Sequence, residues 1–251
     1  MWERKELKDN AKYVLRTSYW KAFLVSLILG FVSGGVSTPN VNFNYRSSDS
    51  SFDSQTEWID WGLLAPFLAL AVGFILIAIF LLLAFRIFLG FPLEVGSMKF
   101  FKRSAEQDVN LNHLGYAFNG QRYLDIVVAM LWRGFLNFLW YLLLIIPGIV
   151  KSYAYSMVPF ILANNPNIGF KRSVELSNQM TRGHKFRIFV LDLSFLGWIF
   201  LGLLACGIGV LFVMPYINAT KAELYLALRK EALERNLTTE AELRLTPPPL
   251  L

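Results

Sequence analysis

The feature that most constrains this chain is an apolar run at positions 62–85, which contains no Asp, Glu, Lys or Arg and ends at Arg86. A helix of about 20 apolar residues crosses the hydrocarbon core of a bilayer. A soluble core would instead need several fully buried helices of that length. Further apolar blocks lie at 19–36, 124–146, 149–163, 188–204 and 210–228. The pattern predicts an all-α, polytopic helical membrane protein with about six spans.

The composition agrees with this class of protein. The chain is 55% hydrophobic and 17% charged, whereas ordinary soluble domains carry about 25% charged residues. The net charge is +6, and the basic residues lie mainly in short segments between the apolar blocks. This arrangement favours anionic membrane lipid over nucleic acid as a partner, so no nucleic acid is expected. The single cysteine, Cys206, excludes an intrachain disulfide.

The N-terminal residues 1–21 are predicted to form an amphipathic cytoplasmic helix. Leu7, Ala11, Val14 and Leu15 recur near helical spacing among charged residues, which is typical of a helix lying at a membrane interface. The alternative is a signal peptide with its apolar core at 22–32.

The remaining organisation follows from the spans. Residues 22–228 are expected to form the six-span membrane domain, and residues 229–251 a charged, Pro-rich cytoplasmic tail. Within the membrane domain we predict an external loop at 37–61 and cytoplasmic segments, with amphipathic helical character, at 86–123 and 164–187. Lys and Arg are concentrated in these cytoplasmic pieces. The positive-inside rule therefore predicts a multi-pass protein of the cell membrane with both termini cytoplasmic.

Proline and glycine mark the expected corners and kinks, because proline lacks a backbone N–H and glycine tolerates a turn. The segment at 87–98 is predicted to be re-entrant or interfacial. The predicted positions are Pro92, Pro147, Gly148, Pro159, Gly207, Gly209 and Pro215.

A weak internal repeat accompanies these corners. The sequence YSMVPFILA at 155–163 resembles LFVMPYINA at 211–219, and each follows a glycine corner. The third and fourth spans and the fifth and sixth spans are therefore predicted to be two copies of one helical hairpin, in parallel orientation.

Among the charged residues within the predicted spans, three are candidates for a buried ion pair. Arg133 lies well inside the third span, Asp125 near its start, and Asp192 inside the fifth. An unpaired arginine in the bilayer centre is costly, so we expect it to find a partner. The similar depth of the two helices predicts an Arg133–Asp192 pair, with Asp125 as the second candidate. The alternatives are helix capping by the two acids and a watery cavity around Arg133.

A basic stretch follows the fourth span and is predicted to form a face for lipid headgroups or a protein partner at the inner leaflet. Its members are Lys171, Arg172, Arg182, His184, Lys185 and Arg187.

Motifs for catalysis are absent from the sequence. No Walker loop, GxSxG, HExxH or paired CxxC occurs. The two histidines, His113 and His184, lie in separate segments, so neither a metal nor a cofactor is expected. Asp125 and Asp192 are the only carboxylates that suggest an intramembrane enzyme. We therefore predict a protein without enzymatic activity.

Several stretches resemble a family of integral membrane proteins, found mainly in Gram-positive bacteria, that is catalogued as domain of unknown function 975. The resemblance rests on IIPGIVKSYAYSMVPFILANNP, FKRSVELSNQMTRGHKFRIF and LSFLGWIFLGLLACGIGVLFVMPYINATKAELY, and also on ELKDNAKYVLRTSYWKAFLVSLI and PLEVGSMKFF. It implies a helical polytopic fold and brings no activity. The chain is more distantly similar to the membrane domain of glycerophosphodiester phosphodiesterases, whose catalytic domain it lacks.

Two functions follow from these observations. The first is a non-enzymatic module that binds lipid or a protein partner, including a second copy of itself, at the inner leaflet. The alternative is a transporter or exporter of a small amphiphile or peptide, which the proline-broken helices and the buried charges favour.

Overall fold

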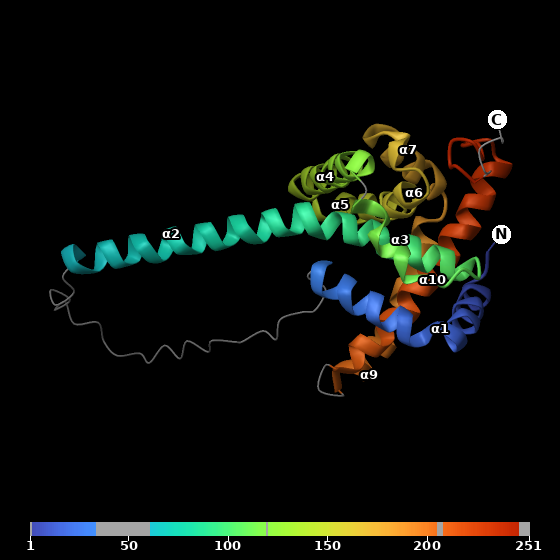
Figure 1. The fold of residues 1–251 in the computed structure, drawn as a ribbon, viewed down its shortest axis with the longest axis horizontal. Helices are drawn as coiled ribbons and strands as arrows, with labels where there is room; N and C mark the ends of the chain where they lie inside the picture. Colours follow the sequence, from blue (N-terminus) through green and yellow to red (C-terminus); the bar gives the residue numbers. More distant parts are fainter. Residues whose placement is uncertain (1, 34–60, 119, 205–207, 246–251) are drawn as a thin grey trace.

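The computed structural model describes residues 2–33, 61–118, 120–204 and 208–245, and these residues form helices and connecting turns without any strand (Figure 1). The helices are α1 (Arg4–Ser33), α2 (Trp61–Phe85), the π-helix η1 (Arg86–Gly90), α3 (Phe91–Ala105), the 3-10 helix η2 (Leu111–Phe118), α4 (Gly120–Leu143), α5 (Ile145–Ala154), α6 (Val158–Asn164), the 3-10 helix η3 (Pro166–Ile168), α7 (Phe170–Met180), α8 (Lys185–Leu193), α9 (Leu196–Leu204) and α10 (Ile208–Glu234).

Four helical stretches among the described residues are long and apolar enough to cross a membrane. They cover Pro66–Ala105, Arg122–Leu143, Ile145–Asn164 and Lys185–Leu204, and they contain the predicted second to fifth spans. The predicted first and sixth spans lie in α1 and α10, which are not among the four. The all-helical membrane class is thus confirmed, whereas the count of six is not.

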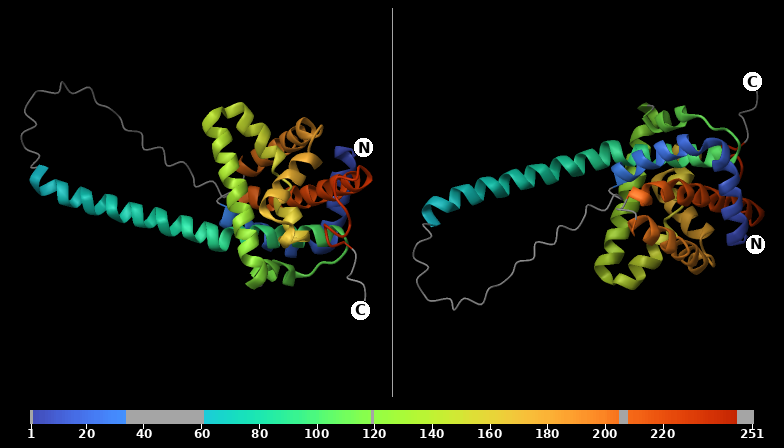
Figure 2. Two further views of the ribbon diagram at one scale, coloured as in Figure 1. Left: turned by 90° about the horizontal axis from the view of Figure 1, so that it is seen from above. Right: turned by 90° about the horizontal axis from the view of Figure 1, so that it is seen from below.

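The α2 helix projects away from the rest of the described chain (Figure 1). No side chain from Pro66 to Phe85 is buried. Its length and uniform apolarity suit a helix surrounded by lipid. Figure 2 shows α4 crossing the run of α2 and α3 steeply, so these helices do not form a parallel bundle.

The prediction of a break at Pro92 is wrong. The helix continues from α2 through η1 into α3, and Pro92 lies just after the π-helical turn. The carbonyl of Phe88, four residues earlier, accepts a hydrogen bond from the Tyr123 hydroxyl at 2.8 Å. Residues 86–105 therefore continue the helix without a re-entrant turn, and Val95 and Phe100 of α3 are fully buried.

The chain reverses between α4 and α5 before the predicted corner at Pro147 and Gly148. Leu144 is extended, with φ −160° and ψ 143°, and reverses the chain. Pro147 and Gly148 lie in the first turn of α5 and not at the corner. Gly148 nevertheless packs closely on α4, because a Cβ there would lie 2.5 Å from Cδ1 of Tyr141.

The second hairpin, of α9 and α10, also closes on glycine. A Cβ on Gly209 would lie 2.7 Å from Cα of Gly202, so the two backbones touch at this point. The predicted corner Gly207 lies outside the described residues. Pro159 begins α6 after a break at 155–157, as predicted, whereas α10 runs through Pro215. Both copies of the proposed repeat are thus helical hairpins, although their interiors differ.

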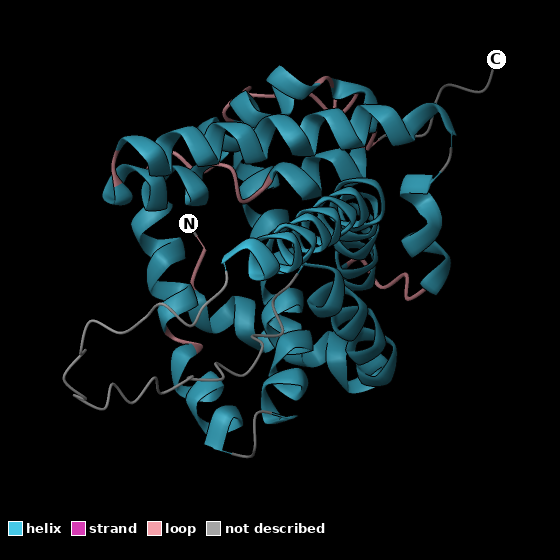
Figure 3. Cartoon of the chain, turned by 90° about the vertical axis from the view of Figure 1, so that its left-hand side faces the viewer, coloured by secondary structure: helices cyan, strands magenta, loops and turns pink. Residues whose placement is uncertain are grey.

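The core forms where α1, α3 and α10 pack together with α6 and α7. Figure 3 shows that the described elements are all helices. Leu7, Ala11, Val14 and Leu15 are buried, which confirms the predicted apolar face of the N-terminal helix. That face contacts α10 within the protein. The helix bends at Ser18, whose hydroxyl donates to the Val14 carbonyl at 2.8 Å. The predicted external loop at 37–61 lies almost wholly outside the described residues.

Candidate functional site

The charges predicted to lie within the membrane are paired, but with other partners than expected. Arg133 of α4 donates from Nη1 to Oε1 of Glu94 on α3 at 3.0 Å. Asp192 of α8 faces Lys221 of α10, with 3.5 Å between Oδ1 and Nζ. The predicted Arg133–Asp192 pair is therefore wrong. Its premise holds for these two residues, since Arg133 and Asp192 each have an opposite charge beside them.

The two ion pairs line one cavity of about 320 Å³. We call it the four-charge cavity, after Glu94, Arg133, Asp192 and Lys221. Polar groups from α5, the following turn and α10 join them, and apolar side chains complete the wall. These further residues include Ser152, Ser156, Asn218, Met157, Phe160 and Leu224. Arg133 and Asp192 are thus brought to the same cavity without being paired.

The carboxylate of Glu94 interacts with two guanidinium groups, those of Arg133 and Arg86. Its Oε2 lies 3.5 Å from Nη2 of Arg86, whose Nη1 donates to the Val32 carbonyl of α1 at 2.7 Å. The Nε of Arg133 is buried and has no hydrogen-bond partner among the described residues. Sequence reasoning missed Glu94 because it was placed in a cytoplasmic segment. A lone acid inside the apolar stretch FPLEV was the signal for it.

Asp125 lies apart from this cavity. It is exposed, and its Oδ2 accepts from Nδ2 of Asn167 at 3.1 Å. It therefore pairs neither with Arg133 nor with Asp192. Within the described part of the chain, no group of three His, Cys, Asp or Glu side chains is arranged to hold a metal ion.

The predicted basic face is divided by the fold. Lys171 and Arg182 are exposed. The other four residues have partners inside the protein, and Lys185 donates to Oδ1 of Asn178 at 3.2 Å. The face is consequently much smaller than the sequence suggested.

Arg172 holds the C-terminal segment, residues 235–245, on α7. Its Nε and Nη2 donate to the two carboxylate oxygens of Glu242 at 2.7 and 3.2 Å. This hydrogen bonding raises the pKa of Arg172 and lowers the pKa of Glu242. Leu243 is fully buried. The described part of the predicted tail is therefore packed against the protein and not a free, fraying end.

His184 and Arg187 also contact distant parts of the chain. Nε2 of His184 lies 3.0 Å from Oε1 of Glu231 on α10. Arg187 donates to the carbonyl of Trp2, and its guanidinium lies 4.4 Å from the centre of the Trp2 ring. The segment before α8 is thus held to both ends of the chain.

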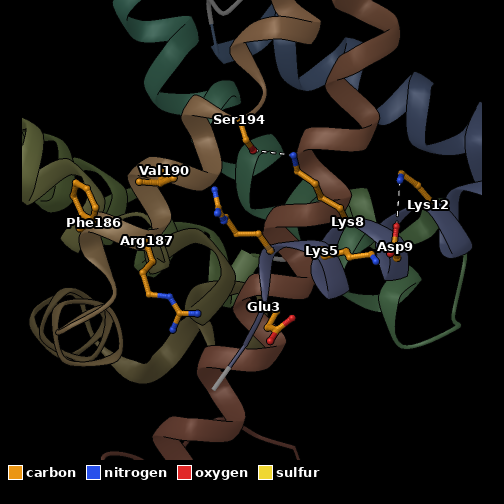
Figure 4. A pocket seen from close by; sticks show the side chains of 10 residues that line it. Glu3, Lys5, Lys8, Asp9, Lys12, Phe186, Arg187, Val190 and Ser194 are labelled. Atoms are coloured by element: carbon orange, nitrogen blue, oxygen red, sulfur yellow. Dashed lines mark hydrogen bonds and ion pairs between the residues drawn. The ribbon is translucent and has the colours of Figure 1, made fainter.

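A different basic surface arises between α1 and α8, which we call the α1–α8 groove (Figure 4). Its volume is about 790 Å³. Five cationic side chains line it against two carboxylates and a short apolar edge. The lining residues are Arg4, Lys5, Lys8, Lys12 and Arg187, with Glu3, Asp9, Phe186, Val190 and Ser194.

Lys8 is the most constrained cation of the groove. Its Nζ donates to Oγ of Ser194 at 2.8 Å and lies 4.6 Å from the centre of the Phe195 ring. Partial burial, and then the charges of Arg4 and Lys12, lowers its pKa. Lys12 pairs with Asp9 at 3.2 Å, but both are more than half exposed, so this pair contributes little. The groove therefore carries an excess of positive charge that a bound anion would offset.

The helical fold and the membrane-length apolar helices define a polytopic helical membrane protein. Residues 142–232, from the end of α4 into α10, match the family model described as "Protein of unknown function (DUF975)". The match confirms the resemblance to domain of unknown function 975 over this segment. Comparison with curated proteins and with solved structures finds no match. The more distant similarity to the phosphodiesterase membrane domain stays a prediction.

Proposed function

We propose that this protein is an integral membrane module without catalytic activity, and that it binds anionic lipid headgroups in the α1–α8 groove. The observation that carries the proposal is the charge of the groove, with five cations against two carboxylates. Each Lys or Arg near an anionic membrane surface contributes about 1 kcal/mol of attraction, which salt screens.

The position of the groove favours a lipid over a soluble anion. Its α8 wall begins the apolar stretch Lys185–Leu204. Phe186, at the edge of the groove, is 75% exposed. A charged groove beside an exposed aromatic ring suits the boundary between headgroups and acyl chains. We assign this boundary to the cytoplasmic leaflet of the cell membrane.

The test is a lipid titration of the purified full-length protein in a nonionic detergent. Phosphatidylglycerol should raise the midpoint of thermal unfolding, phosphatidylcholine should not, and added salt should reduce the shift. The double variant Arg4→Gln/Lys5→Gln should lose most of it, because neither exposed side chain has an acidic partner among the described residues. Lys230→Gln, exposed on α10 outside the groove, is the matched control. Equal shifts with both lipids would refute the proposal.

The exposed α2 helix is the surface that we propose for lipid or for a membrane protein partner, including a second copy of the chain. Its described side chains between Pro66 and Phe85 contact little else in the protein. Cross-linking of single cysteines along α2 in native membranes would separate a protein neighbour from lipid.

Transport is the second candidate function, and the four-charge cavity is the observation that favours it. Charged side chains within membrane helices commonly mark a substrate path. The volume of about 320 Å³ is sufficient for a small amphiphile or a short peptide. Flux of such a solute into liposomes, abolished by Lys221→Met but not by Arg4→Gln/Lys5→Gln, would support transport. Solute-independent leakage in both variants would speak against it.

A further inference from the structure

A second cationic cavity lies between the end of α3, the C-terminal half of α10 and the C-terminal segment. These elements sit at the end of the molecule away from α2 (Figure 1). Its volume is about 230 Å³, and we call it the α3–α10 cavity. The charged residues that line it are Lys99, Lys102, Arg103, Glu106, Arg229 and Arg244.

The charges of this cavity are unbalanced. Glu106 is the single carboxylate of the lining, and its oxygens lie 2.9 Å from Arg229, 3.5 Å from Arg103 and 3.9 Å from Lys102. No acidic side chain lies within 4.0 Å of Lys99 or Arg244 among the described residues. One acid is therefore shared by three cations, while two further cations face the same space.

The α3 helix explains only part of this cluster. The C-terminal end of a helix carries partial negative charge, which stabilises basic residues in its last turn. That effect accounts for Lys102 and Arg103, which lie in the last turn of α3. It does not account for Arg229 of α10 or for Arg244 of the C-terminal segment, which the fold brings to the same cavity.

Lys102 gives the cavity a buried ammonium group. Its residue is 3% exposed, and its Nζ donates to Oδ1 of Asn164, whose Nδ2 donates in turn to the Tyr225 hydroxyl. An ammonium group has three donors, and the neutral Asn164 supplies no charge. Burial of a cation is costly unless an opposite charge compensates it, so a small anion in the cavity would stabilise this arrangement.

The side chains define the class of anion. Arginine forks and lysine ammonium groups together are the usual donors to phosphate oxygens. The cavity is small, and three of its five cations are arranged around Glu106. We propose that the α3–α10 cavity binds a phosphate group and thereby fastens the C-terminal segment to α3. Free phosphate compounds and phospholipid headgroups share this chemistry. The site is distinct from the α1–α8 groove.

The experiment uses the full-length protein in a nonionic detergent and a phosphate-free buffer. Inorganic phosphate should raise the midpoint of thermal unfolding in a saturable manner, beyond the effect of chloride at equal ionic strength. Lys99→Gln/Arg244→Gln should weaken the apparent affinity about tenfold or more, as the loss of charge-assisted hydrogen bonds implies. The single variant Arg244→Gln, at an exposed position, serves if the double variant folds poorly. Arg4→Gln/Lys5→Gln is the control for the groove.

Each outcome decides the proposal. A phosphate effect that depends on Lys99 and Arg244, and not on Arg4 and Lys5, supports a free phosphate compound. A lipid source is supported if phosphate has no effect but phosphatidic acid, unlike phosphatidylcholine, raises the unfolding midpoint in a manner that depends on Lys99 and Arg244. Three results would overturn the proposal. The first is no response to phosphate or to phosphatidic acid, and the second is an adventitious response that is unchanged in Lys99→Gln/Arg244→Gln. The third is a response that is lost only in the groove variant.

Discussion

Glu94 is the acidic partner of two guanidinium groups, those of Arg86 and Arg133. Removing one member of a buried ion pair leaves an uncompensated charge and costs about 3–5 kcal/mol. We expect Arg133→Leu to lower the free energy of unfolding by about 3 kcal/mol, and Glu94→Leu by more, since it leaves two guanidinium groups without their acid. Chemical denaturation in detergent measures both values.

The control is a pair of double variants. Glu94→Leu/Arg133→Leu should recover part of the loss seen in Glu94→Leu, because one orphan charge disappears. Arg133→Leu/Asp192→Leu should give additive losses, because these residues belong to different pairs. Recovery of stability in Arg133→Leu/Asp192→Leu would show that Arg133 and Asp192 interact directly.

The Arg172–Glu242 bond predicts a pH dependence of stability. The pKa of Glu242 is lowered by hydrogen bonding from Arg172. A carboxyl group of this kind stabilises the fold above its unfolded pKa of about 4.3 and loses that contribution as pH falls through the lower, folded value. Glu242→Gln should therefore unfold at a lower temperature than the wild type at pH 7, and the difference should shrink below pH about 4. A difference independent of pH would contradict this role.

At the scale of elements, the two hairpins contain close glycine contacts that differ in how easily the neighbouring atoms can move. Gly202 and Gly209 meet backbone to backbone, whereas Gly148 meets the side chain of Tyr141, which can move. We expect Gly202→Ala to cost roughly 1–3 kcal/mol by overpacking, and Gly148→Ala to cost less. Gly134 of α4 is the matched control, because a Cβ added there would meet nothing within 4 Å. Gly134→Ala should be neutral or stabilising by up to about 1 kcal/mol. Equal losses at Gly134 and Gly202, measured by chemical denaturation, would contradict the packing argument.

The helices themselves were largely predictable, because they depend on local patterns. The apolar face of the first helix and the run at 62–85 are properties of spacing and length, and both agree with α1 and α2. Pro92 was misjudged because proline leaves the carbonyl four residues earlier without its intrahelical donor. Here that carbonyl, of Phe88, accepts a hydrogen bond from Tyr123 of another helix, which the local sequence does not reveal.

For the whole molecule, the contacts between distant segments constrain how the chain crosses the membrane. Arg172 binds Glu242, and Arg187 binds Trp2, so we expect residues 170–187 to lie on the same side of the membrane as both ends. Three membrane-length stretches separate Trp2 from Phe170, and an odd number of crossings would place these two on opposite sides. We therefore expect α1 to cross the membrane as well, and α10 to cross back after α8 and α9. This topology would have the six spans that the sequence predicts.

This topology is testable by cysteine labelling in intact cells, with Cys206 replaced by Ser. A cysteine at Ser50 should react with a membrane-impermeant reagent from outside. A cysteine at Lys171, which is exposed, should react only after the membrane is opened, as should one at Arg244. External labelling at Lys171 would show that α1 does not cross, and would place the segment before α8 outside the cell.

The sequence by itself determined the class of the protein, the positions of its membrane-length helices and its resemblance to a family, because apolar length, helical spacing and short motifs are local properties. The tertiary structure alone decided the partners of the charges. Arg133 binds Glu94 because α3 packs beside α4, and the α1–α8 groove exists because the N-terminus returns to Arg187. A charge in an apolar setting must find an opposite charge, but which charge it meets depends on how helices distant in sequence pack together.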